Sequence, residues 1–235
     1  MNGITFNGKH SFSDFNLIMN GKKISTPSKK KIKESVPFMN SVYDFSTVGS
    51  NGEITYNQRA IEVQFTLIST NKAMLHSKLT KVLEWLQGAS QNKLIFDEIK
   101  DYYFLAEVED NIEPIETSEV AEFTVNFICE PFKTGTSIEG TNQYWDTFNF
   151  ETDYLQNTDF DVVESRNITI YNAGRNTSPM ISTSTTGMSV TINGNTFDLF
   201  EGDNTDYMFK FKNGANTIIA TGTGQIGFYF WKQVL

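Results

Sequence analysis

The sequence predicts a mainly β protein that contains one α-helix. Three features indicate this fold class: short segments in which apolar and polar residues alternate, six Asn-Gly pairs, and 20 Phe in a chain of 235 residues. Alternation with a period of two is typical of a half-buried strand, and aromatic side chains favour sheets. Asn-Gly tolerates φ > 0 at both central positions of a type I′ turn, so several pairs are expected to join neighbouring strands.

These turn signals lie mainly near the two ends of the chain. The Asn-Gly pairs are at positions 2–3, 7–8, 20–21, 51–52, 193–194 and 213–214. Short strands are expected around them, at residues 4–6, 15–19, 189–192, 196–200, 207–212 and 216–220.

The most regular pattern begins at Arg59, in the segment RAIEVQFTLI. Its alternating apolar residues predict a strand with one buried face. The members of that face are Ile61, Val63, Phe65 and Leu67. Residues 71–87 then change to helical spacing, which predicts the single helix. Its apolar stripe consists of Leu75, Leu79, Val82, Leu83 and Leu86. Thr70 or Asn71 can cap the start, and Gly88 is expected to adopt the left-handed conformation after the end.

Three further strands are predicted after the helix, at residues 93–97, 102–109 and 120–129. The inward face of the last one is expected to consist of Ala121, Phe123, Val125, Phe127 and Cys129. Residues 134–143 are then rich in Gly, Thr and polar side chains. This change of composition predicts a domain boundary near residue 133, which separates residues 1–133 from an all-β domain at residues 134–235.

The overall composition excludes several classes of protein. A net charge of −9 argues against a general nucleic-acid binder, which usually presents a basic face. The single cysteine excludes an intramolecular disulfide. No apolar run approaches 18 residues and the N-terminus lacks the apolar core of a signal peptide, so we expect a soluble protein made in the cytoplasm, without membrane insertion.

Charge is distributed unevenly along the chain. Residues 22–33 contain six Lys and no acid, whereas residues 107–122 contain seven acids and no base. The acids are Glu107, Glu109, Asp110, Glu113, Glu116, Glu119 and Glu122. Each segment is typical of a solvated loop. A second interpretation is that the two segments meet across a subunit boundary, because opposite charges orient partners.

Residues suited to catalysis or metal binding are scarce. Two His (His10 and His76) and one Cys cannot form a zinc site of usual spacing. Cys129 is expected to be a small buried thiol, and His76 a surface residue. The segment GTGQIG at residues 222–227 matches a dinucleotide-binding pattern, but only eight residues follow and they resemble a strand instead of the required helix. These glycines are therefore interpreted as turn and close-approach positions.

Two weaker features point toward carbohydrate chemistry. Acid pairs such as Asp159 with Asp161, or Glu151 with Asp153, could serve glycoside hydrolysis, although almost any acidic chain offers such pairs. Five aromatic residues could form a platform for sugar stacking, although core packing or a subunit seam is the commoner role. They are Tyr144, Trp145, Phe148, Phe150 and Tyr154. We therefore nominate no catalytic, metal or cofactor-binding residue, and expect no enzyme.

An ordered set of segments resembles the N-terminal domain of siphophage distal tail proteins, the Dit family. The set comprises ITFNGK at 4–9, VPFMNSVYDFS at 36–46, RAIEVQFTL at 59–67, LTKVLEWLQG at 79–88, LIFDE at 94–98, YYFLAEVED at 102–110 and FICEPF at 127–132. One departure is that the family commonly has Pro-Gly and a basic residue where this chain has Pro37-Phe38-Met39.

The C-terminal part, from residue 167 to the end, is similar to the second Dit domain. The resemblance implies an N-terminal β-sandwich-like, ring-forming domain with one helix, followed by a galectin-like β-sandwich domain. The sugar motif of galectins needs a His, and residues 134–235 contain none, so a lectin activity is not carried over with the fold.

The resemblance further implies a structural protein at the virion tail tip. Such proteins form a homohexameric ring at the distal end of the tail tube, where they contact the major tail tube protein, the tail hub or tail-associated lysin, and receptor-binding or baseplate proteins. An acidic lumen would let DNA pass without specific binding, so the lysines of residues 22–33 are expected to face away from it or to be neutralised by a neighbour. The alternative is a carbohydrate-binding β-sandwich that acts as an adhesion module.

Overall fold

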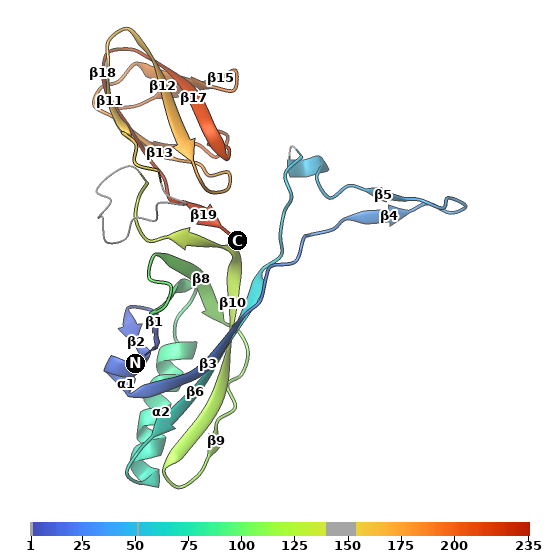
Figure 1. The fold of residues 1–235 in the computed structure, drawn as a ribbon, viewed down its shortest axis with the longest axis vertical. Helices are drawn as coiled ribbons and strands as arrows, with labels where there is room; N and C mark the ends of the chain where they lie inside the picture. Colours follow the sequence, from blue (N-terminus) through green and yellow to red (C-terminus); the bar gives the residue numbers. More distant parts are fainter. Residues whose placement is uncertain (1, 51, 140–153) are drawn as a thin grey trace. The chain divides into compact units, whose positions relative to one another are not determined.

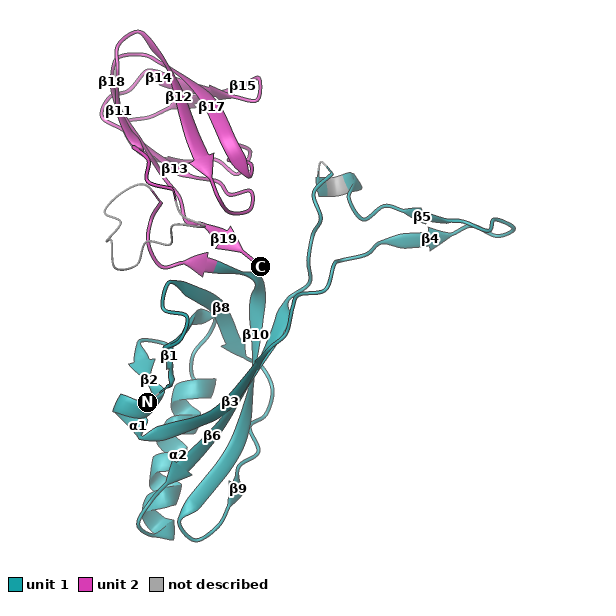
Figure 2. Ribbon diagram, in the orientation of Figure 1, with its two compact units in different colours: residues 1–133, 235 teal, residues 134–234 magenta. Residues whose placement is uncertain are grey.

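The computed structural model describes residues 2–50, 52–139 and 154–235 (Figure 1). The chain divides into two compact units, one formed by residues 1–133 with 235 and the other by residues 134–234 (Figure 2). The described residues are mainly strands with two α-helices, which confirms the predicted fold class. None of the described helices is both long enough and apolar enough to cross a membrane.

Unit 1 is built on one antiparallel sheet with the strand order β2-β1-β7-β8-β10-β6-β3. The strands are β1 (Ile4–Phe6), β2 (Lys9–His10), β3 (Leu17–Ile24), β6 (Arg59–Ile68), β7 (Asn92–Phe96), β8 (Tyr102–Val108) and β10 (Val120–Gly135). The short strand β9 (Ile115–Glu116) also pairs with β10, whereas β19 (Gln233–Val234), which pairs with β10 as well, belongs to unit 2 together with the end of β10 after Lys133. The longest strand pair of the sheet is β6–β10, in which Val63 lies opposite Val125.

The core of unit 1 lies between this sheet and helix α2 (Lys72–Gln87). The alternating residues predicted to face inward on β6 and β10 are all buried, which confirms both strands. Helix α2 buries Leu75, Leu79, Val82 and Leu86, as its spacing predicts, and Asn71 caps it by accepting a hydrogen bond from the Met74 amide. Trp85, which the stripe did not include, is also buried and donates a hydrogen bond to the Phe6 carbonyl at 2.9 Å.

Two local predictions in unit 1 are wrong. A strand was expected from residue 15, but residues 11–15 form a one-turn helix, α1 (Ser11–Phe15), and β3 begins at Leu17. The His10 ring caps α1 by accepting from two backbone amides, a local interaction that leaves no periodic pattern in five residues. Gly88 has a right-handed φ of −79°. A Cβ there would lie 2.5 Å from the Glu84 carbonyl oxygen, so close approach is the reason for glycine.

Unit 2 consists of two four-stranded antiparallel sheets, ordered β11-β18-β13-β16 and β12-β17-β14-β15. The strands are β11 (Asp159–Val162), β12 (Ser165–Asn172), β13 (Met180–Thr183), β14 (Met188–Ile192), β15 (Asn195–Leu199), β16 (Gly202–Thr205), β17 (Gly214–Thr221) and β18 (Gly224–Tyr229). Residues from both sheets form one buried apolar cluster, separate from the core of unit 1.

The strand predicted at residues 207–212 is wrong. Residues 206–209 form a turn in which the Phe209 amide donates to the Asp206 carbonyl, and the neighbouring strand is β16, further upstream. The misleading alternation arises because Phe209 and Phe211 are fully buried although they lie in a loop. Their rings pack edge to face at 5.6 Å. Here aromatic burial fills the end of the core without a strand.

Two of the Asn-Gly pairs form the predicted tight turns. Asn7-Gly8 joins β1 to β2, and Asn193-Gly194 joins β14 to β15; all four residues have positive φ, as a type I′ turn requires. The pair Asn20-Gly21 instead lies within β3, where the register of β3 against β6 shifts between Met19 and Gly21.

Candidate interaction surfaces

The residues that could carry chemistry are dispersed or buried. Within the described part of the chain, no three His, Cys, Asp or Glu side chains come together as a metal site would require. Cys129 is buried, as predicted, and burial raises the pKa of its thiol to about 12, so the nucleophilic thiolate is suppressed. His76 is exposed on α2, as predicted, and His10 lies 3.1 Å from Asp97 while it caps α1.

The glycines of the GTGQIG segment serve β-structure, as interpreted. Residues 224–229 are strand β18, and the described chain after it contains β19 and no helix. Gly222 has a φ of +116°, and a Cβ there would lie 3.0 Å from the Met188 Cα. These are close-approach positions of a sheet, and a dinucleotide site is excluded because the helix that would face the pyrophosphate is absent from this segment.

The most exposed part of unit 1 is a long hairpin, residues 25–58, which we call the arm. It extends from the body of unit 1 between β3 and β6 and contains β4 (Lys33–Ser35) and β5 (Val42–Asp44) (Figures 1 and 2). Every residue from 28 to 45 is exposed. Backbone hydrogen bonds hold the hairpin together, for example from Lys30 to Thr55 and from Phe45 to Ile32. Hydrogen bonds from Ser46 and then from Lys31 keep the pKa of Asp44, near the end of the β4–β5 pair, well below its ordinary range.

The arm exposes an unusual amount of apolar surface. Its exposed large hydrophobic residues are Ile32, Val36, Phe38, Met39, Val42, Tyr43, Phe45, Val48 and Ile54. So many exposed apolar side chains on one hairpin favour an interaction site, because their contact with water is unfavourable. The sequence reading of residues 22–33 as a charged loop did not predict this hairpin.

Phe38 lies at the tip of the arm, and its backbone has a conformation that is unfavourable for any residue other than glycine. The Met39 amide donates to the Val36 carbonyl at 3.1 Å, which closes a turn around Pro37 and Phe38. Pro37 fixes the first central position and Phe38 has a φ of +67°, the geometry of a type II turn whose second central position prefers glycine. A left-handed backbone costs a non-glycine residue about 1–2 kcal/mol. This turn is where the chain departs from the Pro-Gly pattern that is common in the Dit family. The side chain of Phe38 is fully exposed.

An acidic hollow lies on the outer face of the unit 1 sheet, opposite α2. Its volume is about 430 Å³. It is lined by Asn20, Gln64, Phe65, Asn111, Glu113, Ile115, Glu122, Phe123 and Thr124. Ile115 is 75% exposed at its rim. Among the described residues, neither of its carboxylates, nor any other acid of residues 107–122, forms an ion pair.

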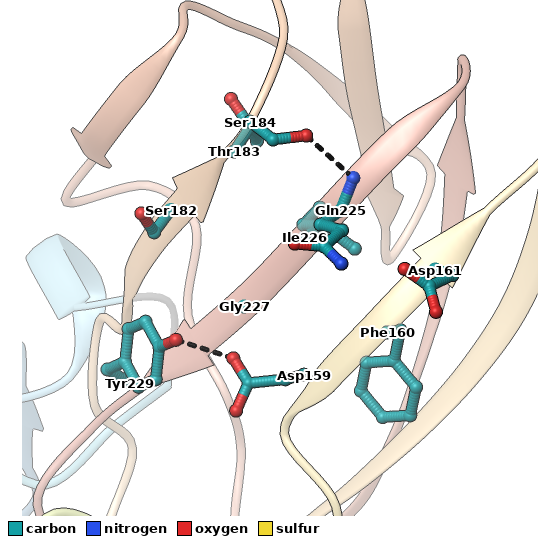
Figure 3. Close-up of a pocket in the computed structure, with 10 residues that line it drawn as sticks. All are labelled: Asp159, Phe160, Asp161, Ser182, Thr183, Ser184, Gln225, Ile226, Gly227 and Tyr229. Carbon is teal, nitrogen blue, oxygen red and sulfur yellow. Dashed lines mark hydrogen bonds between the residues drawn. The ribbon is translucent and has the colours of Figure 1, made fainter.

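A polar hollow of about 370 Å³ lies on the outer face of β11, β18 and β13 in unit 2 (Figure 3). Asp159 and Tyr229 point toward each other over Gly227, and the Tyr229 hydroxyl donates to Asp159 Oδ1 at 2.5 Å. This hydrogen bond raises the pKa of Tyr229 to about 12. A Cβ on Gly227 would lie 2.6 Å from both oxygens, so only glycine leaves room for the pair.

The structure brings some of the predicted carbohydrate residues to this hollow. Asp159 and Asp161 both line it, beside Gln225 and Ser184. The pair Glu151 and Asp153, and the aromatic residues 144–150, lie outside the described residues. Tyr154 is described, and its ring packs against Tyr171 with 3.9 Å between ring centres.

Comparison with known proteins finds a matching domain and a solved structure of similar fold. Residues 18–129 match the model of the phage tail protein RIFT-related domain, and no curated protein sequence matches significantly. The fold of the whole chain is similar to the crystal structure of the Dit protein of phage SPP1, described as a hub of the adsorption apparatus in phages that infect Gram-positive bacteria. That match has a TM-score of 0.69 and 13% identity, and it covers 100% of both chains. Residues 18–129 thus match a phage tail protein domain, and the chain has the fold of a Dit protein.

A second solved structure, the baseplate of phage p2 in its activated conformation with Sr, matches 98% of both chains at 8% identity. Its TM-score of 0.39 is too low to support an argument. The match of residues 18–129 to a phage tail protein domain agrees with the sequence resemblance to a tail protein. The arm, the acidic hollow and the polar hollow are the candidate interaction surfaces of this fold.

Proposed function

We propose that this protein forms a homohexameric ring at the distal end of the tail tube. The ring would link the major tail tube protein to the tail hub or tail-associated lysin, and would hold receptor-binding or baseplate proteins at its periphery. The observation that carries the proposal is the arm, because its row of exposed apolar side chains needs a partner surface. A stable interface buries well over about 1,000 Å², and a projecting hairpin supplies such area from few residues.

The charges of unit 1 are compatible with a ring. The basic segment and the exposed acids lie on different parts of the same chain. When such patches meet head to tail from copy to copy, the copies form a closed ring or an open filament. Six copies is the number that the Dit resemblance implies.

The lysines of residues 22–33 are compatible with a ring whose lumen lets DNA pass. Lys22 pairs with Glu98, Lys23 Nζ lies 3.3 Å from Glu62, and Lys31 Nζ lies 3.0 Å from Asp44. Half of this basic segment is thus neutralised within its own chain, and the excess of acids elsewhere leaves few cations to bind phosphate.

The ring makes a direct prediction about mass. Purified full-length protein is expected to give particles of about 160 kDa, six times the chain mass of 26.6 kDa, with six-fold rings in negative-stain images. Mass photometry and light scattering across a concentration series measure this. Deletion of residues 28–54 is expected to leave monomers with a native circular dichroism spectrum. A full-length protein that remains monomeric at its highest soluble concentration, with no rings on grids, would overturn the proposal.

The polar hollow supports a second candidate function, recognition of a neutral saccharide by unit 2. Two carboxylates, two serine hydroxyls, a glutamine amide and a tyrosine line it, and no cation is among the lining residues. Carboxylate and amide oxygens accept hydrogen bonds from sugar hydroxyls, whereas an anionic polymer would be repelled. The absence of the galectin histidine means that any such site would differ from the galectin site.

Binding of neutral oligosaccharides on a glycan array tests this second function. Asp161→Asn, at the hollow, is expected to weaken binding by about tenfold, since hydrogen bonds to a charged acceptor contribute most. Asp198→Asn, an exposed acid on the opposite sheet, is the matched control and should bind as the unaltered protein does. No retained glycan, or equal losses in both variants, would exclude the hollow as a saccharide site.

A further inference from the structure

We infer that the arm of one copy docks in the acidic hollow of the next copy, with Phe38 as its apolar anchor. This inference rests on the proposed ring and specifies its seam. Phe38 is the most exposed large hydrophobic side chain of the described residues, and it sits at a turn position that glycine would fill without strain. A strained and solvent-exposed aromatic residue is unfavourable in the isolated chain, so its value must come from a contact outside the chain.

Charge complementarity identifies the partner as a second copy of the same chain. Below the tip, the arm carries Lys29, Lys30 and Lys33, which are exposed and have no ion-pair partner among the described residues. The acidic hollow offers Glu113 and Glu122, also without ion pairs, and the apolar side chain of Ile115 at its rim. A hairpin with unpaired lysines and an apolar tip therefore fits an acidic hollow with an apolar rim.

The geometry of unit 1 prevents the arm from reaching the hollow of its own copy. The arm leaves the sheet where Ile24 pairs with Ile61, whereas the hollow lies further along the same strand pair, at Asn20, Gln64 and Phe65. From that exit the arm extends away from the body of unit 1 (Figure 2). The fourteen residues from Ser25 to Phe38 span roughly 40 Å when extended, enough to reach a neighbour. Donor and acceptor surfaces are different patches, which makes the contact head to tail.

Site-specific cross-linking of the full chain tests the contact. The native cysteine is buried and its thiol is unreactive, so added cysteines give a clean signal. The double variant Met39→Cys/Ile115→Cys keeps the Phe38 anchor, because Met39 is the exposed neighbour of Phe38 at the tip. Treated with a short bismaleimide, it is expected to give a ladder of cross-linked copies on denaturing gels. Met39→Cys/Phe200→Cys is the control, because Phe200 is 76% exposed but lies in unit 2. It should give no ladder.

Two outcomes separate this inference from the ring itself. Rings in negative-stain images without a ladder from the Met39→Cys/Ile115→Cys variant would overturn the docking and leave the ring standing. Monomers without rings or a ladder would overturn both. A ladder in the control as strong as in the test variant would also overturn the docking, since it would show random collision.

Substitutions at the tip and in the hollow give an independent test. Phe38→Gly removes the anchor but suits the turn, so the arm keeps its fold while ring association is expected to weaken at least about tenfold. Lys30→Glu/Lys33→Glu and Glu113→Lys/Glu122→Lys are each expected to weaken association, and an equimolar mixture of the two variants to recover it. Rings of unchanged concentration dependence in Phe38→Gly, or no recovery in the mixture, would contradict the docking.

Discussion

Replacement of Trp85 by alanine is expected to lower the unfolding free energy of unit 1 by about 3–5 kcal/mol, the usual cost of truncating a large buried aromatic residue. Trp85 is 5% exposed and connects three elements. It belongs to α2, its ring stacks on Phe15 of α1 with 4.6 Å between ring centres, and its indole N–H donates to the Phe6 carbonyl of β1. The substitution therefore leaves a cavity and also removes the hydrogen-bond partner of a buried carbonyl.

A second variant divides this loss into its two causes. Trp85→Phe keeps most of the apolar contact and loses the N–H donor, so it is expected to cost about 1–3 kcal/mol. Chemical denaturation followed by far-ultraviolet circular dichroism measures both. The unfolding of unit 2 should remain unchanged, because its apolar cluster contains no residue of unit 1. A loss below about 1 kcal/mol for Trp85→Ala would show that Trp85 does not hold α1, α2 and β1 together.

Trp85 also illustrates which buried residues a sequence period can predict and which it cannot. The stripe from Leu75 to Leu86 was predictable because a single sheet covers that face of α2, and one covering surface imposes one period. Trp85 lies on the flank of the stripe and is buried by α1 and β1, which the helix pattern alone does not reveal. The strands β6 and β10 were predictable for the same reason as the stripe, since each has one face on the core and one in solvent.

The candidate interaction surfaces were predictable only in their charge. The lysines of residues 22–33 and the acids of residues 107–122 are visible in the sequence, and the hypothesis that they meet across a subunit boundary remains a proposal. The arm was not predictable, because all its residues from 28 to 45 are exposed and no alternation of burial shapes that part of its sequence. The pair of Asp159 and Tyr229 is separated by 70 positions, so only the register of β11 against β18 brings it together.

Replacement of Gly222 by alanine is expected to lower the unfolding free energy of unit 2 by about 2–4 kcal/mol, for two reasons that add. The residue has a φ of +116°, a region that is strained for any side chain. The new Cβ would also lie 3.0 Å from the Cα of Met188, a backbone atom of β14 that cannot turn aside as a flexible side chain could. Relief requires a shift of β14 against β17 at the edge of the buried cluster.

Gly194→Ala separates the strain from the close contact. Gly194 also has a positive φ, +81°, but nothing lies within 4 Å of the position its Cβ would occupy. This control is therefore expected to lose only the conformational cost, about 1 kcal/mol. Denaturation of both variants, with the transition of unit 1 as an internal reference, measures the difference. Equal losses at the two positions would mean that the glycine of the GTGQIG segment is required by backbone conformation alone. A larger loss at Gly222 would show that tight packing of β14 selects glycine there, a constraint that reproduces part of a dinucleotide-binding pattern without its chemistry.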